Sequence, residues 1–244
     1  AISFGDSDAL DRAITPNTAA FLVEPIQGEA GIVLPPAGYL RRVREICTRH
    51  NVLLICDEVQ TGMGRTGRNF AYEHDGILPD AVALGKALGG GLLPVSAFVA
   101  RADVMAVFTP GDHGSTFGGN PLSAAVGLAA VKLLQREKLA DRAQELGDYL
   151  LKRLQAIDHP AIINVRGRGL FIGMELDPEV VSGREFCEAL LRRGLLSKDT
   201  HHTVVRFAPP LTISRETLDQ ALAIIEATLE ELADSPARAL TTSV

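Results

Sequence analysis

The chain places a helical pattern directly before a continuous apolar run, and this order constrains the fold more than any other feature. In GYLRRVREICTRHN (residues 38–51) apolar residues recur at helical spacing, and VLLICDE (52–58) follows at once as an apolar run ending in two acids. Such a run is typical of a strand buried on both faces of a parallel sheet. Similar runs at 19–25, 81–85 and 95–100 predict three more strands. We therefore expect an α/β layer with a mostly parallel sheet.

In the second half of the chain, predicted helices and strands alternate less regularly. Asn120 can cap and Pro121 can open a long helix, and a second amphipathic helix follows. This looser alternation predicts a smaller α+β domain. The later predicted elements are helices at 121–138 and 139–157, strands joined at a glycine turn within 161–176, a helix near 183–193, a strand at 203–209 and a helix opened by Ser214.

The domain organisation follows from this change of pattern. We expect a partial large domain over residues 1–140, a small C-terminal domain over 141–236 and a flexible tail over 237–244. A length of 244 residues suits one large domain or two smaller ones with a real core. The chain opens without a methionine, close to a helix start, so we expect it to be the inside of a longer protein.

Composition excludes several classes of function. The formal net charge is −6, the charges are interspersed and aromatic residues are few, so nucleic acid is not an expected partner. Apolar runs stay below the roughly 18 residues of a membrane span, and no signal peptide is visible, which predicts a cytoplasmic protein. The three cysteines lack CxxC spacing and are expected to be buried thiols: Cys47, Cys56 and Cys187.

Three polar residues follow predicted strands where each strand ends. Glu24 follows FLV, Asp57 follows VLLIC, and Lys86 follows AVALG. Ligands of open α/β sheets bind outside the carboxyl ends of the strands. Asp57 and Lys86 are 29 residues apart (86 − 57), about one crossover unit, so a carboxylate and an amine are expected to face one crevice. Each residue alone also fits a simpler role, as a cap of a turn or a solvated lysine.

A lysine beside a carboxylate is suited to the chemistry of pyridoxal phosphate (PLP). A lysine amine can form a Schiff base with an aldehyde cofactor, and an aspartate can keep the cofactor's ring nitrogen protonated. The segment HGSTFGGNP offers Ser115, Thr116 and glycines to a phosphate just before a helix N-terminus, although an ordinary loop and cap would look the same. The histidines at 113, 201 and 202 lack metal-ligand spacing and are interpreted as loop residues.

Two adjacent stretches match a known family. LLICDEVQTGMGRTG, followed by PDAVALGKALGGG, resembles the signature of the class III PLP-dependent aminotransferases. The resemblance runs from FLVEPIQGEAGI to near residue 235, and GKALGGGLLPVSA and LLSKDTHHTVVRFAPPL resemble the ornithine-type members most. It implies a PLP-dependent transferase fold of type I, with a partial large domain and a small α+β domain. It also implies transfer of the δ-amino group of ornithine to 2-oxoglutarate.

The resemblance assigns roles around the cofactor ring. Lys86 becomes the Schiff-base lysine that also moves a proton, and Asp57 becomes the partner of the pyridinium nitrogen. Val59 packs on the ring face, and Gln60 lies near the phenolic oxygen. Thr116, with Ser115, reaches the phosphate of a neighbouring subunit's cofactor, so a homodimer is implied.

The resemblance also assigns two substrate-binding residues. Arg206 binds a substrate carboxylate in a bidentate fork. Glu24 pairs with Arg206 when ornithine is bound and releases it for the carboxylates of 2-oxoglutarate or glutamate. On their own, Arg206 would be interpreted as a surface arginine and Glu24 as a strand-end cap.

Members of the family are longer at the N-terminus, where they supply further cofactor- and substrate-binding groups. We therefore expect a C-terminal piece that needs an N-terminal half for full activity, and strands with apolar edges left bare. Three alternatives remain: an enzyme for acetylornithine or another ω-amino acid or an aminomutase, a non-catalytic subunit that only dimerises, and an unrelated α/β binding domain.

Overall fold

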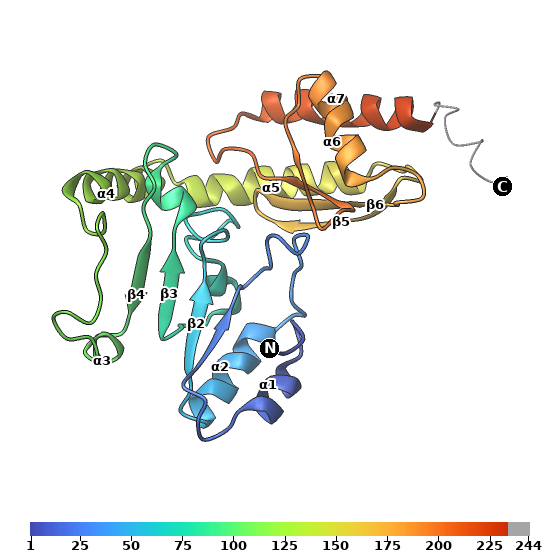
Figure 1. The fold of residues 1–244 in the computed structure, drawn as a ribbon. Helices are drawn as coiled ribbons and strands as arrows, with labels where there is room; N and C mark the ends of the chain where they lie inside the picture. Colours follow the sequence, from blue (N-terminus) through green and yellow to red (C-terminus); the bar gives the residue numbers. More distant parts are fainter. Residues whose placement is uncertain (234–244) are drawn as a thin grey trace. The chain divides into compact units, whose positions relative to one another are not determined.

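The structure is a computed structural model that describes residues 1–233 (Figure 1). These residues divide into two compact units. The first comprises Ala1–Gly28 and Val33–Gln144, and the second comprises Glu29–Ile32 and the chain from Glu145 onward. The predicted flexible tail over 237–244 lies outside the described residues.

The first unit contains a four-stranded sheet in the order β1-β2-β3-β4. β1 pairs with β2 and β2 with β3 in parallel, while β4 runs antiparallel to β3, so the prediction of a mostly parallel sheet is confirmed. All four strands lie inside the apolar runs that predicted them. Their bounds are Ala20–Val23 for β1, Leu53–Asp57 for β2, Ala81–Leu84 for β3 and Ala97–Ala100 for β4.

Helix α2 (Tyr39–Arg49) packs on β2, and helix α1 (Ser7–Ala13) packs against α2 (Figure 1). The apolar side chains of α2 recur at helical spacing and face the sheet, where Val43 and Ile46 are fully buried beside Leu54. Burying one such side chain contributes about 1.5–3 kcal/mol. The helical pattern seen in the sequence therefore supplies the main contact that holds this face of the sheet.

The remaining elements of the first unit follow or connect the four strands. Asn120 caps α4 by accepting a hydrogen bond from Ser123 N at 2.8 Å, and Pro121 occupies the first turn, as predicted. Helix α4 packs against the short 3₁₀ helix η2, which begins at Lys86. The bounds are η1 Ala71–Asp75, η2 Lys86–Gly89, α3 Ala102–Met105, α4 Pro121–Arg136 and α5 Leu139–Gln155, the last crossing into the second unit.

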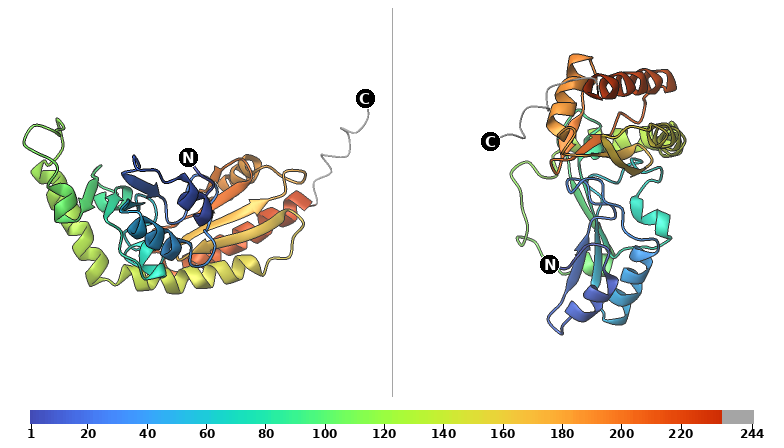
Figure 2. Two further views of the ribbon diagram at one scale, coloured as in Figure 1. Left: turned by 90° about the horizontal axis from the view of Figure 1, so that it is seen from below. Right: turned by 90° about the vertical axis from the view of Figure 1, so that its right-hand side faces the viewer.

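The second unit contains an antiparallel sheet in the order β5-β6-β8-β7. Helices α6 and α7 lie on the same face of this sheet (Figure 2). β7 was not predicted, because its three residues, KDT, are polar and carry no apolar pattern. The bounds are β5 Ile162–Arg168, β6 Phe171–Leu176, α6 Gly183–Arg192, β7 Lys198–Thr200, β8 Val204–Phe207 and α7 Arg215–Ala233.

The cysteines are free and buried, as predicted. Burial raises the pKa of Cys47 to about 11, so its thiol stays protonated near neutral pH. Within residues 1–233 no helix is long and apolar enough to cross a membrane. The same range holds no group of three or more His, Cys, Asp or Glu side chains placed to bind a metal.

Candidate active site

The carboxyl ends of β1, β2 and β3 lie at one edge of the first sheet because these strands are parallel. Glu24 directly follows β1, Asp57 is the last residue of β2, and Lys86 comes two residues after β3. Asp57 is paired in register with Ala83. The structure therefore brings Asp57 and Lys86 to the same edge of two neighbouring strands.

The backbone around Lys86 makes a sharp turn out of β3. Lys86 itself has φ +43°, a left-handed conformation that costs an ordinary residue about 1 kcal/mol or more. Before it, a Cβ on Gly85 would lie 3.4 Å from the side chain of Val59. Such strained residues cluster at functional sites. The turn leaves the Lys86 side chain exposed, not buried.

Lys86 lines a cavity of about 530 Å³ in the first unit. This volume falls within the range of small-molecule sites. Val59 and Ser115 line the same cavity, together with the residues before α4, whose positive helix end faces it. Ser115 Oγ accepts a hydrogen bond from Gly118 N at 3.1 Å, and both Ser115 and Thr116 are exposed.

The acidic and amide side chains at this edge have short-range backbone partners. Asp57 Oδ1 accepts a hydrogen bond from Val59 N at 3.0 Å. Glu24 Oε2 accepts one from Gly28 N at 2.9 Å. A Cβ on Gly28 would lie 2.5 Å from Gln60 Nε2, so the amide of Gln60 packs directly on this glycine. These contacts connect the loop after β1 with the loop after β2.

A second carboxylate beside Asp57 was not selected from the sequence. Glu58 is 1% exposed, and burial raises its pKa. It accepts hydrogen bonds from Thr61 Oγ1 at 2.5 Å and from Tyr72 N at 2.9 Å. These bonds join the loop after β2 to η1, so Glu58 supports the backbone that carries Asp57. The only sequence signal was a second acid after the apolar run.

Arg206 lies on β8 of the second unit and pairs with the carboxylate of Glu29. Arg206 Nη1 donates to Glu29 Oε1 at 2.8 Å, and Lys198 Nζ lies 3.4 Å from the other oxygen. The hydrogen bond from Arg206 is the largest cause that lowers the pKa of Glu29, to about 2. Sequence reasoning selected Glu24 for this pairing. A pairing of Glu24 with Arg206 would join the two units and stays a prediction.

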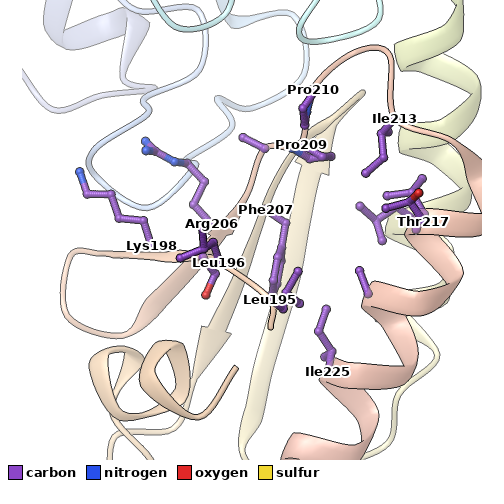
Figure 3. Close-up of a pocket in the computed structure, with 15 residues that line it drawn as sticks. Leu195, Leu196, Lys198, Arg206, Phe207, Pro209, Pro210, Ile213, Thr217 and Ile225 are labelled. Atoms are coloured by element: carbon purple, nitrogen blue, oxygen red, sulfur yellow. The ribbon is translucent and has the colours of Figure 1, made fainter. Parts of the chain in front are cut away.

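A second cavity, of about 400 Å³, lies beside Arg206 in the second unit (Figure 3). Its walls are mostly apolar and come from α5, β8, α7 and the loops before β7 and after β8. Phe207 points into it, whereas the charged ends of Lys198 and Arg206 point together to another side (Figure 3). The cavity itself therefore offers little to a doubly charged substrate.

The sequence matches the family model described as aminotransferase class-III over residues 5–229. The chain belongs to this family. A curated relative, the ornithine aminotransferase of Exiguobacterium sp., is 57% identical over 234 residues, 96% of this chain. The family resemblance drawn from the motifs around Asp57 and Lys86 is thus confirmed.

Solved structures of two aminotransferases share the fold. The ornithine aminotransferase of Toxoplasma gondii, described with partial occupancy of PLP at its active site, has a TM-score of 0.92 at 46% identity and covers 95% of this chain. The acetylornithine aminotransferase of Elizabethkingia anophelis has a TM-score of 0.90, also at 46% identity, and covers 94%. The fold is therefore that of a PLP-dependent aminotransferase.

The chain spans only part of these relatives. It covers 58% of the Exiguobacterium protein, 55% of the Toxoplasma chain and 59% of the Elizabethkingia chain. This agrees with the expected fragment of a longer family member.

Proposed function

We propose that this chain is the catalytic-lysine portion of a PLP-dependent aminotransferase that moves the δ-amino group of ornithine to 2-oxoglutarate, giving glutamate 5-semialdehyde and glutamate. One observation carries the proposal: Lys86, on a strained turn, lines a cavity at the edge where Asp57 ends the neighbouring strand. The identity to relatives named ornithine aminotransferase supports the choice of substrate.

The cavity of about 530 Å³ beside Lys86 has room for a small molecule, and the side chains at this edge have the chemistry that PLP needs. When bound, PLP supplies an aldehyde carbon for an amine to bond to and a ring that draws electrons from the reacting carbon. Lys86 Nζ would provide that amine and would move a proton at the amine-bearing carbon of the substrate. The Asp57 carboxylate would hold the proton on the ring nitrogen. Val59 would pack on the ring, and Gln60 would interact with its phenolic oxygen.

Ser115 and Thr116 extend the phosphate-binding part of the proposal. Both hydroxyls are exposed, on the segment that leads into the N-terminus of α4. We assign them to the phosphate of a cofactor held by a second subunit, so the active form is a homodimer, completed by an N-terminal half. Catalysis in the cytoplasm fits a chain with buried free thiols.

Arg206 is the proposed carboxylate-binding residue of the second unit. Its planar guanidinium suits the two oxygens of a substrate carboxylate. Glu29 pairs with Arg206 in the structure. It would neutralise the arginine when ornithine is bound, because the reacting end of ornithine carries an amine and no carboxylate. The carboxylate of 2-oxoglutarate or glutamate then replaces Glu29. Glu24 keeps a structural hydrogen bond to Gly28 and is the weaker candidate for this exchange.

Covalent capture of the cofactor tests the proposal. The chain is mixed with PLP, reduced with borohydride and mapped by mass spectrometry. We expect the cofactor mainly on Lys86, with a visible absorbance band that disappears in Lys86→Ala and persists in Lys132→Ala. Equal labelling of several lysines, or identical spectra for wild type and Lys86→Ala, would show that this chain does not form the cofactor site.

The similarity to an acetylornithine aminotransferase makes N-acetylornithine the alternative amine donor. The chain is co-expressed with the N-terminal portion of a relative, and ornithine and N-acetylornithine are compared as amine donors by kcat/KM. A higher value for ornithine supports the proposed function. A higher kcat/KM for N-acetylornithine would identify N-acetylornithine, and not ornithine, as the amine donor. An inactive complex without bound PLP would indicate a subunit that only dimerises.

A further inference from the structure

One face of the second sheet carries a row of residues from all four of its strands. In register, Arg166 of β5 stands beside Gly173 of β6, Gly173 beside Arg206 of β8, and Arg206 beside Lys198 of β7. Residues paired across antiparallel strands point to the same face. The two arginines therefore project from one face, on either side of a residue that has no side chain.

The segment Glu29–Ile32 lies over this glycine. Ile32 is fully buried, and a Cβ on Gly173 would lie 3.1 Å from the Ile32 side chain. Gly31 has φ +104°, and a Cβ there would lie 3.0 Å from Val204 Cγ2. The close approach of the segment to the sheet thus depends on glycine on both sides of the contact.

Arg166 holds one end of the segment by its backbone. Its Nη2 donates to Gly31 O at 2.8 Å, and its Nε lies 3.1 Å from Ile32 O. Its Nη1 donates to the carboxylate of Glu175, which fixes the guanidinium plane. The Arg166 side chain is only 22% exposed, so these charge-assisted bonds are partly shielded from water. A lysine could not make this set of contacts.

The other end of the segment carries Glu29, whose carboxylate meets Arg206 and Lys198. The Glu29 side chain is 59% exposed. An exposed ion pair contributes little by itself and orders two long side chains only at an entropic cost. The pair therefore needs a backbone that already places Glu29 opposite Arg206.

We propose that Arg166 is a positioning residue that fixes Glu29–Ile32 on the second sheet so that Glu29 stays against Arg206. The inference rests on the proposed function in one respect, because there Arg206 exchanges Glu29 for a substrate carboxylate. The hydrogen bonds of Arg166 go to the backbone of the segment and to Glu175. By holding the backbone two residues away from Glu29, Arg166 sets how strongly Glu29 competes with the substrate.

The pKa of Glu29 reports this positioning without cofactor or substrate. Arg206 and Lys198 lower it, and Arg166 acts on it through the segment that it holds. Glutamate side chains of the chain are labelled with ¹³C, the Glu29 signal is assigned with Glu29→Gln, and the carboxyl is titrated by NMR. In Arg166→Lys we expect the pKa to rise from about 2 toward the ordinary 4.5.

Two further variants and a control complete the test. Glu175→Gln and Gly31→Ala disturb the same segment while keeping Arg166, and each should raise the Glu29 pKa. Arg193→Lys, which changes an arginine paired with Glu231 in the same unit, should leave it unchanged. An unchanged Glu29 pKa in folded Arg166→Lys or Glu175→Gln overturns the inference. Because no PLP is added, that result is distinct from a failure of the proposed function.

Discussion

At the scale of single residues, Asp80 shows how one buried carboxylate joins the amino ends of β2 and β3 to the carboxyl end of β4. It is 5% exposed, and its Oδ2 accepts hydrogen bonds from Leu54 N at 2.7 Å and Arg44 Nη1 at 2.6 Å. Its Oδ1 accepts one from Arg101. Burial acts to raise the pKa of Asp80, but Leu54 N–H and the two guanidinium groups lower it overall.

We predict that Asp80→Asn destabilises the chain by about 3 kcal/mol at pH 7, because it leaves the buried Leu54 N–H and the largely buried Arg44 guanidinium without a charged acceptor. A lowered pKa stabilises the folded state above the ordinary value of 3.8, and this contribution is lost as the pH falls below it. The difference between wild type and variant in urea unfolding should therefore shrink below that pH. Asp103→Asn, which removes an exposed partner of the same Arg101, should have little effect. A similar loss in both variants would contradict this reasoning.

At the scale of elements, α5 crosses the turn between β5 and β6 at two glycines. A Cβ on Gly147 of the helix would lie 2.1 Å from the backbone carbon of Gly169, and Gly169 occupies the turn with φ +56°. No shift of a flexible side chain can relieve a contact with backbone. The glycine in α5 therefore sets how closely the helix approaches the hairpin.

We predict that Gly147→Ala destabilises the second unit by about 2 kcal/mol or more, the cost of overpacking, although alanine normally favours a helix by about 1 kcal/mol. Gly127→Ala in α4 is the matched control, since a Cβ there would meet its nearest neighbour at an ordinary 3.7 Å. It should be neutral or stabilising. Thermal unfolding of both variants checks the prediction. A higher melting temperature for Gly147→Ala would contradict it.

At the scale of the whole molecule, the first sheet ends in two strands that pair on one side only among residues 1–233. Leu22 on β1 is 62% exposed, and Phe98 on β4 is 47% exposed. Open strands with apolar side chains are templates for pairing with other chains. The bare edges expected from the sequence are present in these described residues.

We predict that the chain associates with itself in solution, with a mass above its 26.0 kDa in sedimentation at micromolar concentration. Charged side chains block edge pairing, so Leu22→Lys and Phe98→Lys should shift the distribution toward monomer. Leu191→Lys changes a leucine of similar exposure on α6 and should not. A monomer at every concentration, or an equal effect of the control, would rule out the edges as the cause.

The sequence alone determined the elements and the site candidates that depend on local pattern. Apolar runs and helical spacing located β1 to β4 and α2, because burial on a sheet requires that periodicity. Asp57 and Lys86 could be placed at one sheet edge because parallel strands joined by a crossover end on the same side. The family followed from the motifs around the same two residues.

Tertiary structure alone decided the features that depend on contacts between distant segments. β7 exists because β8 offers it hydrogen bonds, not because KDT favours a strand. Glu24 and Glu29 both follow β1 and look equivalent in the sequence. The packing of Glu29–Ile32 on Gly173 and Arg166 is what puts Glu29 beside Arg206. Hydrophobic periodicity in the sequence indicates which face of a helix or strand is buried. An ion pair between distant residues forms only where the folded backbone brings the two side chains together.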